Sequence, residues 1–589
     1  MKKASFTRYS FLGALLTLFA VAIFVQMVRI QNSADAEVLN DWAANYGYES
    51  RRIQSERGYI YDRWGNLLAG NKQVYEVGIE LKFVKNPAAI ASATSKVLGL
   101  DYGFVFKSAT NPPEDLNYIT LADFITSDQI DELSRLKTQY ENNNPYGSDP
   151  NKPSLRGLVW SPHLQRTYPE QDLASNVLGF YTFYDRKEGA GYYGVEEMYG
   201  DLLGGVSKDV LISLDPYEMQ EIPTVPPGAS LVLTIDREIQ RSMEKILDHA
   251  VAANKADSGA IIVMNPKNGE ILAMANTPRL NPNTYWNYND YFPAGSSYNK
   301  SVNQIYEPGS VFKVITMAAA LDAGVVTPQT PFFDTGQIEV GGWTIYNWDR
   351  GAWGEQDMIG CMQHSLNVCL SWVATQIGAE KFYDYLERFG IGHRTNIDLA
   401  GEEVYPLSVP GDPTWYTINL ATNSFGQGLA VTPIQLLTAV SAIANDGKMM
   451  APHVLKSYIQ NGQQYDTAPQ VVGMPISAET AKTLTDMLAI SLEQEASDAL
   501  VEGYRVAGKT GTAEIAVNGQ YTSNQTNASF IGWGPVDDPQ FIVFIWLEKP
   551  RTSIWGSIVA APVFRDAVQE LVVLMGLPPD DIRLSLAEK

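Results

Sequence analysis

The sequence contains few of the residues from which metal sites and disulfide frameworks are built. Its 589 residues include two cysteines, Cys361 and Cys369, and five histidines. Two cysteines cannot form a disulfide framework or a cysteine-rich zinc site, so we expect both to be small residues of the core. The histidines show no metal-binding spacing. The sequence therefore predicts no metal site and no cofactor.

Positive charge is also scarce. Lysine and arginine total 43 against 66 aspartates and glutamates, which gives a formal net charge of -23. Such a surface repels a phosphate backbone, so nucleic acid is not expected as a partner. The hydrophobic fraction of 45% and the aromatic fraction of 11% exclude wholesale disorder. We expect several domains with large buried cores.

One long apolar run, Phe11 to Val28, stands near the amino terminus. Its eighteen residues at ~1.5 Å each span about 27 Å, close to the ~30 Å of a bilayer's hydrocarbon core. Lys2, Lys3 and Arg8 precede the run, which predicts that the start stays in the cytoplasm and the body is exported. We expect residues 1–8 to be a cytoplasmic tail and residues 9–30 a single-pass helix in the cell membrane, with the body of the chain outside the cytoplasm.

A cleaved signal peptide is the alternative, because Ala34-Asp35-Ala36 resembles a cleavage site. The apolar run is long for a signal peptide and Arg29 stands before the Ala-x-Ala, so the uncleaved anchor is favoured. In either case the body lies outside the cytoplasm, where it meets no ATP.

The remainder divides near residue 230. Residues 31–230 mix short strand-like runs with stretches rich in proline, glycine and asparagine, and Glu221 to Ser230 is the clearest linker. After it, Asp236 is expected to cap an amphipathic helix from Arg237 to about Ala253. Residues 578–589 are expected to form a tail.

Strands and helices are not evenly mixed in residues 231–577. Two strands are predicted at 259–264 and 269–276, mainly helices over 311–500, three strands at 506–517, 528–532 and 540–546, and a closing helix at 561–575. Clustered strands on both sides of a helical insertion indicate an α+β fold. We expect one antiparallel sheet covered by helices, with a helical subdomain inserted.

The pattern Ser-x-x-Lys places a lysine one helical turn after a serine. It occurs at Ser134/Lys137, Ser242/Lys245, Ser297/Lys300 and Ser310/Lys313. The first two pairs lie inside predicted helices and the third in a loop. Only Ser310, after Glu307-Pro308-Gly309, opens an apolar helix, Val311 to Ala323.

A serine at the start of a helix faces unpaired backbone N–H groups, which favour a developing oxyanion. Lys313 would share its face of the helix. To accept the serine proton, the lysine pKa must fall from ~10.4 towards neutrality, through burial or a second cation. A plain helix-capping serine is the alternative reading of Ser310.

Two further motifs weigh against the interpretation of Ser310 as a plain helix-capping serine. Ser365-Leu366-Asn367 precedes a predicted helix and can place a hydroxyl and an amide side by side. Lys509-Thr510-Gly511-Thr512 begins an alternating strand. Lys509 could be the second cation and could attract an anionic substrate terminus, and Gly511 would let a substrate backbone approach. The edge of that strand could pair with an extended peptide.

Together, Ser310-Val-Phe-Lys313, Ser365-Leu-Asn367 and Lys509-Thr-Gly511 resemble the three motifs of penicillin-binding proteins and serine β-lactamases. Segments 57–63, 166–169 and 191–196 resemble pedestal motifs of the class B penicillin-binding proteins, and segments 424–428 and 528–532 resemble the division-specific, FtsI-like branch. The resemblance implies that residues 31–230 form an elongated pedestal or dimerisation-like domain and residues 231–577 a transpeptidase domain.

The resemblance also implies roles. Ser310 would attack the carbonyl between the two terminal D-alanines of a peptidoglycan stem peptide, and Lys313 would accept its proton. Ser365 would relay a proton to the leaving amine, with Lys509 nearby. The substrate-binding residues implied are Asn367, Thr510, Gly511 and Thr512, with the N–H groups of Ser310 and Thr512 forming the oxyanion hole. β-Lactams would acylate the same serine.

The resemblance implies as partners a SEDS-family glycosyltransferase and other cell-division membrane proteins. Two related functions stay open: a β-lactamase, for which no water-activating carboxylate can be assigned, and a non-catalytic sensor or division scaffold. A P-loop ATPase is the unrelated alternative, because Gly503 and Gly508-Lys509-Thr510 fit GxxxxGK[ST]. A P-loop must precede a helix, whereas here a strand follows, so this function is excluded.

Overall fold

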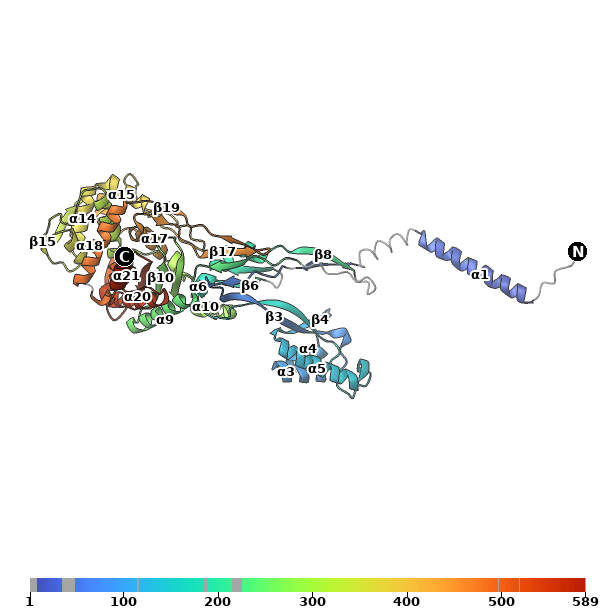
Figure 1. Cartoon of the computed structure of the whole chain (residues 1–589). Coiled ribbons are helices and arrows are strands. Elements are labelled where there is room, and N and C mark those ends of the chain that lie inside the picture. The colour runs from blue at the N-terminus through green and yellow to red at the C-terminus, as the bar shows by residue number, and fades with distance from the viewer. Residues whose placement is uncertain are drawn as a thin grey trace. The chain divides into compact units, whose positions relative to one another are not determined.

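The computed structural model describes residues 8–33, 48–53, 55–113, 116–184, 188–213, 225–495, 497–517 and 520–587. The chain divides into two compact units, Met1–Glu56 with Gly204–Gly228 and Arg57–Leu203 with Ala229–Lys589. Figure 1 labels their elements. Several sequence features lie outside the described residues: Lys2 and Lys3, the possible cleavage site at 34–36, residues 221–224 of the expected linker, and an expected turn at 518–519.

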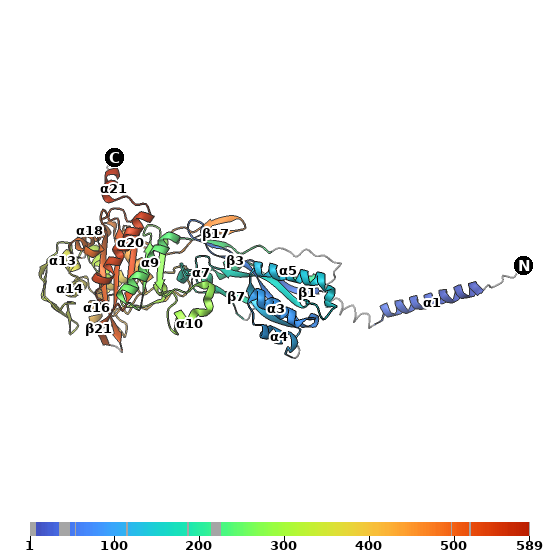
Figure 2. The ribbon, with the colours of Figure 1, turned by 90° about the horizontal axis from the view of Figure 1, so that it is seen from below.

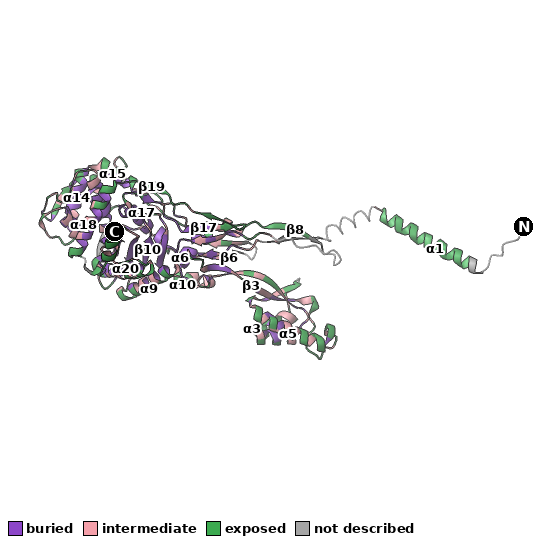
Figure 3. Ribbon diagram, viewed as in Figure 1, coloured by how far each residue is buried: buried purple, intermediate pink, exposed green. Residues whose placement is uncertain are grey.

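The first unit contains the apolar helix predicted near the amino terminus. Helix α1 (Arg8–Gln31) includes a stretch, Phe11–Gln31, that is long and apolar enough to cross a membrane. Every residue of that stretch is exposed, as Figure 3 shows in green. In the same unit, β1 (Tyr48–Ile53) pairs antiparallel with β8 (Lys208–Ser213).

A five-stranded antiparallel sheet forms the centre of the catalytic part of the second unit. Its order is β11-β10-β22-β21-β20. The strands are β10 (Ser258–Met264), β11 (Ile271–Thr277), β20 (Ala507–Val517), β21 (Gln520–Gly534) and β22 (Phe541–Glu548). The two strands before the helical insertion and the three after it thus join in one sheet, as predicted.

Both faces of this sheet are covered, so its central strands are apolar throughout instead of alternating. On β22, Ile542 and Phe544 pack into one core cluster, whereas Val543 and Ile545 pack into another. Each cluster needs its own covering layer, because side chains of successive strand residues point to opposite faces.

The first and last helices of the domain cover one face. Helices α9 (Arg237–Asn254) and α20 (Ala561–Leu574) lie side by side (Figure 2). Asp236 caps α9 by accepting the N–H groups of Glu238 and Ile239. The helix then buries Ile239, Met243 and Leu247, spaced by one turn, against the sheet.

The helical subdomain packs on the other face. It contains α12 (Lys313–Asp322), α13 (Met358–Gln363), α14 (Asn367–Ile377), α15 (Ala379–Arg388), α16 (Thr417–Ser424), α17 (Pro433–Ser441) and α18 (Ala478–Glu495). In α12 every residue from Lys313 to Ala320 is buried. A helix buried on all sides must be apolar all round, which explains why the run after Ser310 carries so few polar residues.

The insertion also holds short strands that we did not predict. They are β12 (Phe332–Asp334) with β15 (Gly354–Gln356), β13 (Gln337–Val340) with β14 (Trp343–Tyr346), and β16 (Met449–Met450) with β19 (Val471–Gly473). Gly341 and Gly342 join β13 to β14 with φ of 60° and 81°. Two glycines with positive φ are typical of a tight hairpin turn. The prediction of mainly helices over residues 311–500 did not include this hairpin.

A second sheet joins the pedestal to the catalytic domain. Its order is β18-β17-β9-β2-β3-β4, and β5 also pairs with β3. The strands are β2 (Ile60–Tyr61), β3 (Leu67–Glu80), β4 (Tyr118–Ile125), β5 (Leu158–Thr167), β9 (Ser230–Leu233), β17 (Leu455–Gln460) and β18 (Gln463–Asp466). Strand β9, which follows the predicted linker, pairs with β2 and β17 and not with the five-stranded sheet. The predicted boundary at residue 230 falls within it.

Three helices pack on the pedestal strands around their own core. They are α3 (Pro87–Leu98), α4 (Tyr102–Thr110) and α5 (Ser127–Asn143). The shorter elements are η1 (Leu81–Phe83), η2 (Pro145–Gly147), α6 (Ser175–Leu178), β6 (Phe180–Tyr184), β7 (Glu188–Tyr192), α7 (Gly194–Met198), α8 (Gly200–Gly204), η3 (Pro282–Asn287), α10 (Tyr288–Tyr291), α11 (Lys300–Asn303), η4 (Gly309–Phe312), η5 (Ile443–Asn445), η6 (Ser497–Ala499), α19 (Gly556–Val559) and α21 (Asp580–Ala587).

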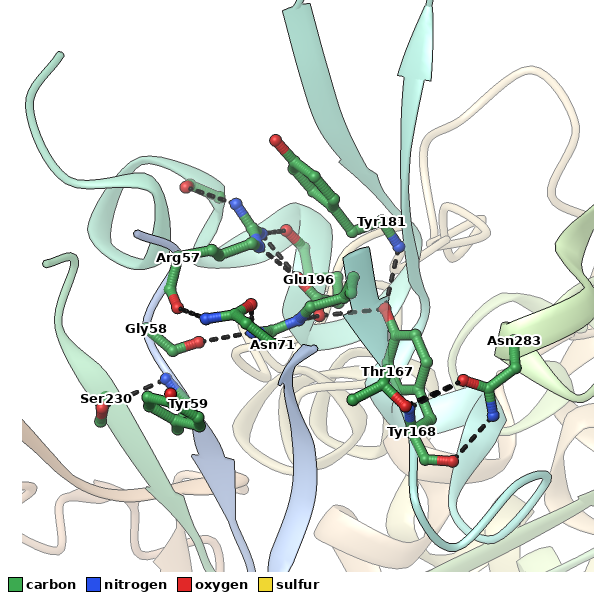
Figure 4. A network of polar contacts seen from close by, with 12 residues as sticks. Arg57, Gly58, Tyr59, Asn71, Thr167, Tyr168, Tyr181, Glu196, Ser230 and Asn283 are labelled. Carbon is green, nitrogen blue, oxygen red and sulfur yellow. Dashed lines mark hydrogen bonds and ion pairs between the residues drawn. The ribbon is translucent and has the colours of Figure 1, made fainter. Parts of the chain in front are cut away.

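The three pedestal motifs meet at one buried carboxylate (Figure 4). Glu196 accepts hydrogen bonds from Arg57 Nε and Arg166 Nε, each at 2.7 Å, and from the Tyr168 hydroxyl at 3.1 Å. Burial alone would raise the pKa of Glu196, but the guanidinium groups of Arg166 and Arg57 outweigh it and lower that pKa. The network ties together segments that are distant in the sequence.

Candidate active site

Ser310 lies at the start of the buried helix of the helical subdomain. It belongs to the 3-10 turn η4, and α12 begins three residues later at Lys313. Ser310 is therefore not an N-cap residue, which removes the capping interpretation. Gly309 has φ of 61°, and a side chain there would meet the Thr512 carbonyl at 2.9 Å. Glycine thus lets the turn pack closely against strand β20.

Lys313 is fully buried, and its side-chain nitrogen makes three polar contacts. Its Nζ donates to the Ser365 carbonyl at 2.5 Å, to Ser365 Oγ at 3.0 Å and to Asn367 Oδ1 at 2.8 Å. Burial lowers the pKa of Lys313 well below its ordinary value, and the charge of Lys509 lowers it further. Both causes expected from the sequence operate here, so a neutral amine is accessible at this position.

Ser365 occupies the short link between α13 and α14. Its backbone has φ of 53°, in the left-handed region that residues other than glycine rarely adopt. This conformation directs both its carbonyl and its hydroxyl to Lys313. Asn367 begins α14 and also donates from Nδ2 to the Tyr346 carbonyl at 3.2 Å.

Lys509, Thr510 and Thr512 lie on β20, which is an edge strand of the five-stranded sheet. Lys509 is only 5% exposed. Burial lowers the pKa of Lys509 to about 8, and the negative charge of Glu495 opposes that shift. Lys509 Nζ donates to Thr510 Oγ1 at 3.3 Å, and Thr512 Oγ1 accepts the N–H of Gly556 at 3.0 Å.

Gly511 lies between Thr510 and Thr512 on β20. A side chain there would meet Ser529 Oγ at 2.4 Å and Val311 Cγ1 at 2.8 Å. Such a side chain would therefore point into the protein interior. Glycine is required because β20 packs directly on the turn that carries Ser310.

A cavity of about 310 Å³ brings the motifs together. Ser310, Ser365, Lys509, Thr510 and Thr512 line it. Lys313 and Asn367 do not line it, but Lys313 contacts Asn367 and the cavity residue Ser365. Five of the eight predicted site residues thus line one cavity, and Gly511 lies behind them against Val311 and Ser529.

The other Ser-x-x-Lys pairs have structural partners. Lys300 pairs with Glu548 at 2.8 Å, and Ser242 donates to Glu570 at 3.2 Å. Ser134 lies within α5, on the pedestal. None of these serines lines the catalytic cavity.

Aromatic residues of the cavity wall were not identified from the sequence. Trp348 and Trp555 line the cavity, and their ring centroids are 5.0 Å apart in an edge-to-face contact. Trp348 Nε1 also donates to the His364 carbonyl at 3.1 Å. The twelve tryptophans carry no local pattern that separates these two from the others.

The two cysteines correct a prediction. Cys361 in α13 and Cys369 in α14 are fully buried, as expected of core residues, but they form a disulfide bond. The bond spans the Ser365 motif and joins the helices on either side. Sequence spacing does not reveal whether two Cα atoms lie within the short distance that a disulfide requires.

Among the residues that the structure describes, no group of three or more histidine, cysteine, aspartate or glutamate side chains could hold a metal ion. A hydroxyl beside a buried lysine of low pKa, facing a second lysine on a sheet edge, defines the class of serine acyl-transfer enzymes.

Comparison with known proteins identifies the family. The family model described as Penicillin binding protein transpeptidase domain matches residues 259–569, and the Penicillin-binding Protein dimerisation domain matches residues 52–220. The chain is 33% identical to stage V sporulation protein D of Bacillus subtilis over 92% of this chain and 81% of that protein. It is 28% identical to the peptidoglycan D,D-transpeptidase FtsI of Escherichia coli over 90% of this chain and 85% of that protein.

The fold agrees with a solved structure. Penicillin Binding Protein 2X of Streptococcus thermophilus matches with a TM-score of 0.75 and 22% identity, over 89% of this chain and 80% of that one. The chain belongs to the class B penicillin-binding proteins, the family of serine D,D-transpeptidases that cross-link peptidoglycan. The predicted family, fold class and enzyme class are thereby confirmed.

Proposed function

We propose that Ser310 is the nucleophile of this transpeptidase and Lys313 its base. The observation that carries the proposal is the convergence at Ser365, whose hydroxyl lies 3.0 Å from Lys313 Nζ while Ser310 and Lys509 line the same cavity. Because burial and the charge of Lys509 both lower the pKa of Lys313, its neutral amine is available to take the proton from Ser310 Oγ.

In the acylation step, Ser310 Oγ forms an ester with the carbonyl carbon between the two terminal D-alanines of a stem peptide. The C–N bond to the last D-alanine breaks, Ser365 gives its proton to the departing amine, and Lys313 passes the proton it took from Ser310 to Ser365. The backbone N–H groups of Ser310 and Thr512 receive the oxyanion. Loss of one such donor costs about 3 kcal/mol of barrier in comparable sites.

Lys509 and Thr510 hold the terminal carboxylate of the substrate, and Asn367 binds its acyl-side amide. An amine from a neighbouring stem peptide then attacks the ester and gives up a proton to Lys313, which returns it to Ser310 Oγ as the C–O bond of the ester breaks. The product is a cross-link between two glycan strands. Extension of an edge strand by a peptide also suits the position of β20 at the edge of the sheet.

We also propose that α1 anchors the chain in the cell membrane by a single pass and that the body lies outside the cytoplasm. A disulfide between Cys361 and Cys369 supports this location, because disulfides persist in oxidising compartments. In this setting a SEDS-family glycosyltransferase would supply glycan strands during septal wall synthesis. Site-specific cross-linking from α1 in membranes tests the pairing, and a failure to capture such a protein would contradict it.

Labelling with a fluorescent penicillin tests the chemistry. We expect one covalent adduct per chain by intact mass, with the modified peptide containing Ser310. Ser310→Ala abolishes the adduct, whereas Ser297→Ala, from another Ser-x-x-Lys pair, retains it. Labelling that persists in Ser310→Ala would refute the assignment. Rapid turnover of the adduct would instead indicate a β-lactamase, and cell-division complementation by Ser310→Ala would indicate a scaffold.

A further inference from the structure

The cavity that contains Ser310 includes one carboxylate among its lining residues. Glu495 ends helix α18 and lines the cavity together with Ser365 and Lys509. It belongs to none of the three sequence motifs. Its negative charge acts on Lys509, which lines the same cavity.

Glu495 lies against the residue that precedes Ser365. Its Oε2 lies 2.7 Å from Nδ1 of His364. The imidazole also stacks on Trp353, with ring centroids 4.0 Å apart and an interplanar angle of 22°. The backbone of His364 is held as well, because its N–H donates to the Gly360 carbonyl at 2.9 Å and its carbonyl accepts from Trp348.

The restraint on His364 matters because of the backbone at the next residue. Ser365 has a left-handed φ of 53°, and such a conformation persists only where its surroundings impose it. Its carbonyl and hydroxyl are both contacts of Lys313 Nζ. A displacement of His364 would therefore move two of the three groups that hold Lys313.

Glu495 also acts on the opposite wall of the cavity. Its charge raises the pKa of Lys509 against the effect of burial. Among the described residues, two further charged groups lie one contact away: Lys313 contacts Ser365, and Asp349 accepts the indole N–H of Trp353 at 3.1 Å. Glu495, His364 and Lys509 line the same cavity.

We propose that Glu495 is a positioning residue of the transpeptidase, which holds the Ser365 segment through His364 and places a carboxylate in the same cavity as Lys509. Glu495 would not contact the reacting atoms. It would connect the second motif, which lies at the junction of two helices, with the third motif, which lies at the edge of the sheet. The inference rests on the proposed roles of Ser310, Lys313 and Lys509.

The test compares Glu495→Gln with Glu493→Gln in the full chain. Glu493 lies on the same helix but pairs with Arg505 at 2.9 Å and does not line the cavity. The rate of acylation by a fluorescent penicillin is measured from acidic to alkaline pH. We expect a loss of roughly 10- to 100-fold for Glu495→Gln at neutral pH, since displacement of a catalytic group by about 1 Å can cost 100-fold. Glu493→Gln should stay within about twofold of wild type.

The pH profile separates positioning from simple loss of structure. Lys509 holds the carboxylate only as an ammonium, so the rate falls as pH rises through its pKa. Removing the charge that raises this pKa moves the fall to lower pH in Glu495→Gln. A variant that is merely less stable would keep the wild-type midpoint. Glu495→Asp, which retains the charge, should restore the midpoint even if the rate is only partly recovered.

His364→Gln provides a second, independent measurement. If Glu495 acts through His364, the acylation rate of the double variant should be almost the same as that of either single variant. If the two residues act independently, the fold losses in rate should multiply. A wild-type rate and pH profile in Glu495→Gln would overturn the inference. So would an unchanged acylation rate with slower release of the acyl group, because Glu495 would then be a water-activating base. Failure of the wild type to label would instead refute the proposed function.

Discussion

The side-chain nitrogen of Lys313 lies 3.0 Å from the hydroxyl oxygen of Ser365, a residue from a different helix junction. The contact connects the first two motifs of the active site. Because Lys313 is fully buried, its polar partners come from the protein and not from bulk water. The consequences of this contact for activity can be measured directly.

Replacement of Lys313 by methionine should remove the base while keeping most of the side-chain volume. We expect the rate of penicillin acylation to fall by about 10²- to 10⁴-fold, the usual contribution of a general base. The measurement is stopped-flow or gel-based labelling at neutral pH. Lys245→Met is the matched control, because Lys245 follows Ser242 at the same spacing but is exposed. Equal losses in both variants would contradict the assignment.

The acylation rate should depend on pH through Lys509. Its pKa is lowered to about 8 by burial, so the ammonium that binds a carboxylate is lost as pH rises through that value. We expect the rate with a carboxylate-bearing β-lactam to fall above that pH. An ester of the same β-lactam lacks the charge and should not show the decline. Identical profiles for acid and ester would mean that another group titrates.

The disulfide between Cys361 and Cys369 should stabilise the catalytic domain. The two cysteines are eight residues apart in sequence, and closing a loop of this size contributes about 2–3 kcal/mol in the chain-entropy model. Cys361→Ala with Cys369→Ala should lower the melting temperature. Reductant should lower that of the wild type in the same way and leave the double variant unchanged. If reductant also lowered the melting temperature of the double variant, the reductant would be acting at a place other than this disulfide.

Glu196 should be essential for the stability of the pedestal. Glu196→Gln leaves Arg57 and Arg166 buried without their counter-ion, and breaking a buried pair in this way costs about 3–5 kcal/mol. Chemical denaturation measures the loss. Asp384→Asn is the control: it breaks an exposed pair with Arg388, for which we expect less than about 1 kcal/mol. A similar effect of both variants would show that the network is not structurally important.

Glu244 should make stability decrease with pH in the mildly acidic range. Burial raises its pKa from 4.5 to about 7, although Arg279 opposes the shift. The folded state therefore binds more protons than the unfolded state between those two values, so unfolding free energy declines as pH rises through them. The decline is at most about 3 kcal/mol. Glu244→Gln should flatten this part of the curve of melting temperature against pH, whereas an unchanged slope would assign it to other groups.

Local signals in the sequence predicted the elements that depend on near neighbours. Asp236 followed by apolar residues at helical spacing predicted α9 and its cap. The apolar run at 540–546 predicted β22, because a strand covered on both faces needs no alternation. The motifs around Ser310, Ser365 and Lys509 predicted the residues that meet in the cavity.

Features that depend on distant segments were missed or misread. Strand β9 joins β2 and β17 because the pedestal folds back beside it. Gly511 is needed because Val311 and Ser529 occupy the space behind it. The Gly341–Gly342 pair is a local signal for a turn, but the sequence analysis predicted mainly helices in this region and did not include the hairpin.

The order of the residues by itself determined the chemical groups available for acyl transfer and the helices and strands that carry them, because propensity and motif spacing are local properties. Only the tertiary structure decided that Lys313 is buried, that Cys361 and Cys369 are bonded, and that Glu495 meets His364. Burial and contact between remote segments depend on how whole layers pack, and the pKa values of both lysines follow from that packing.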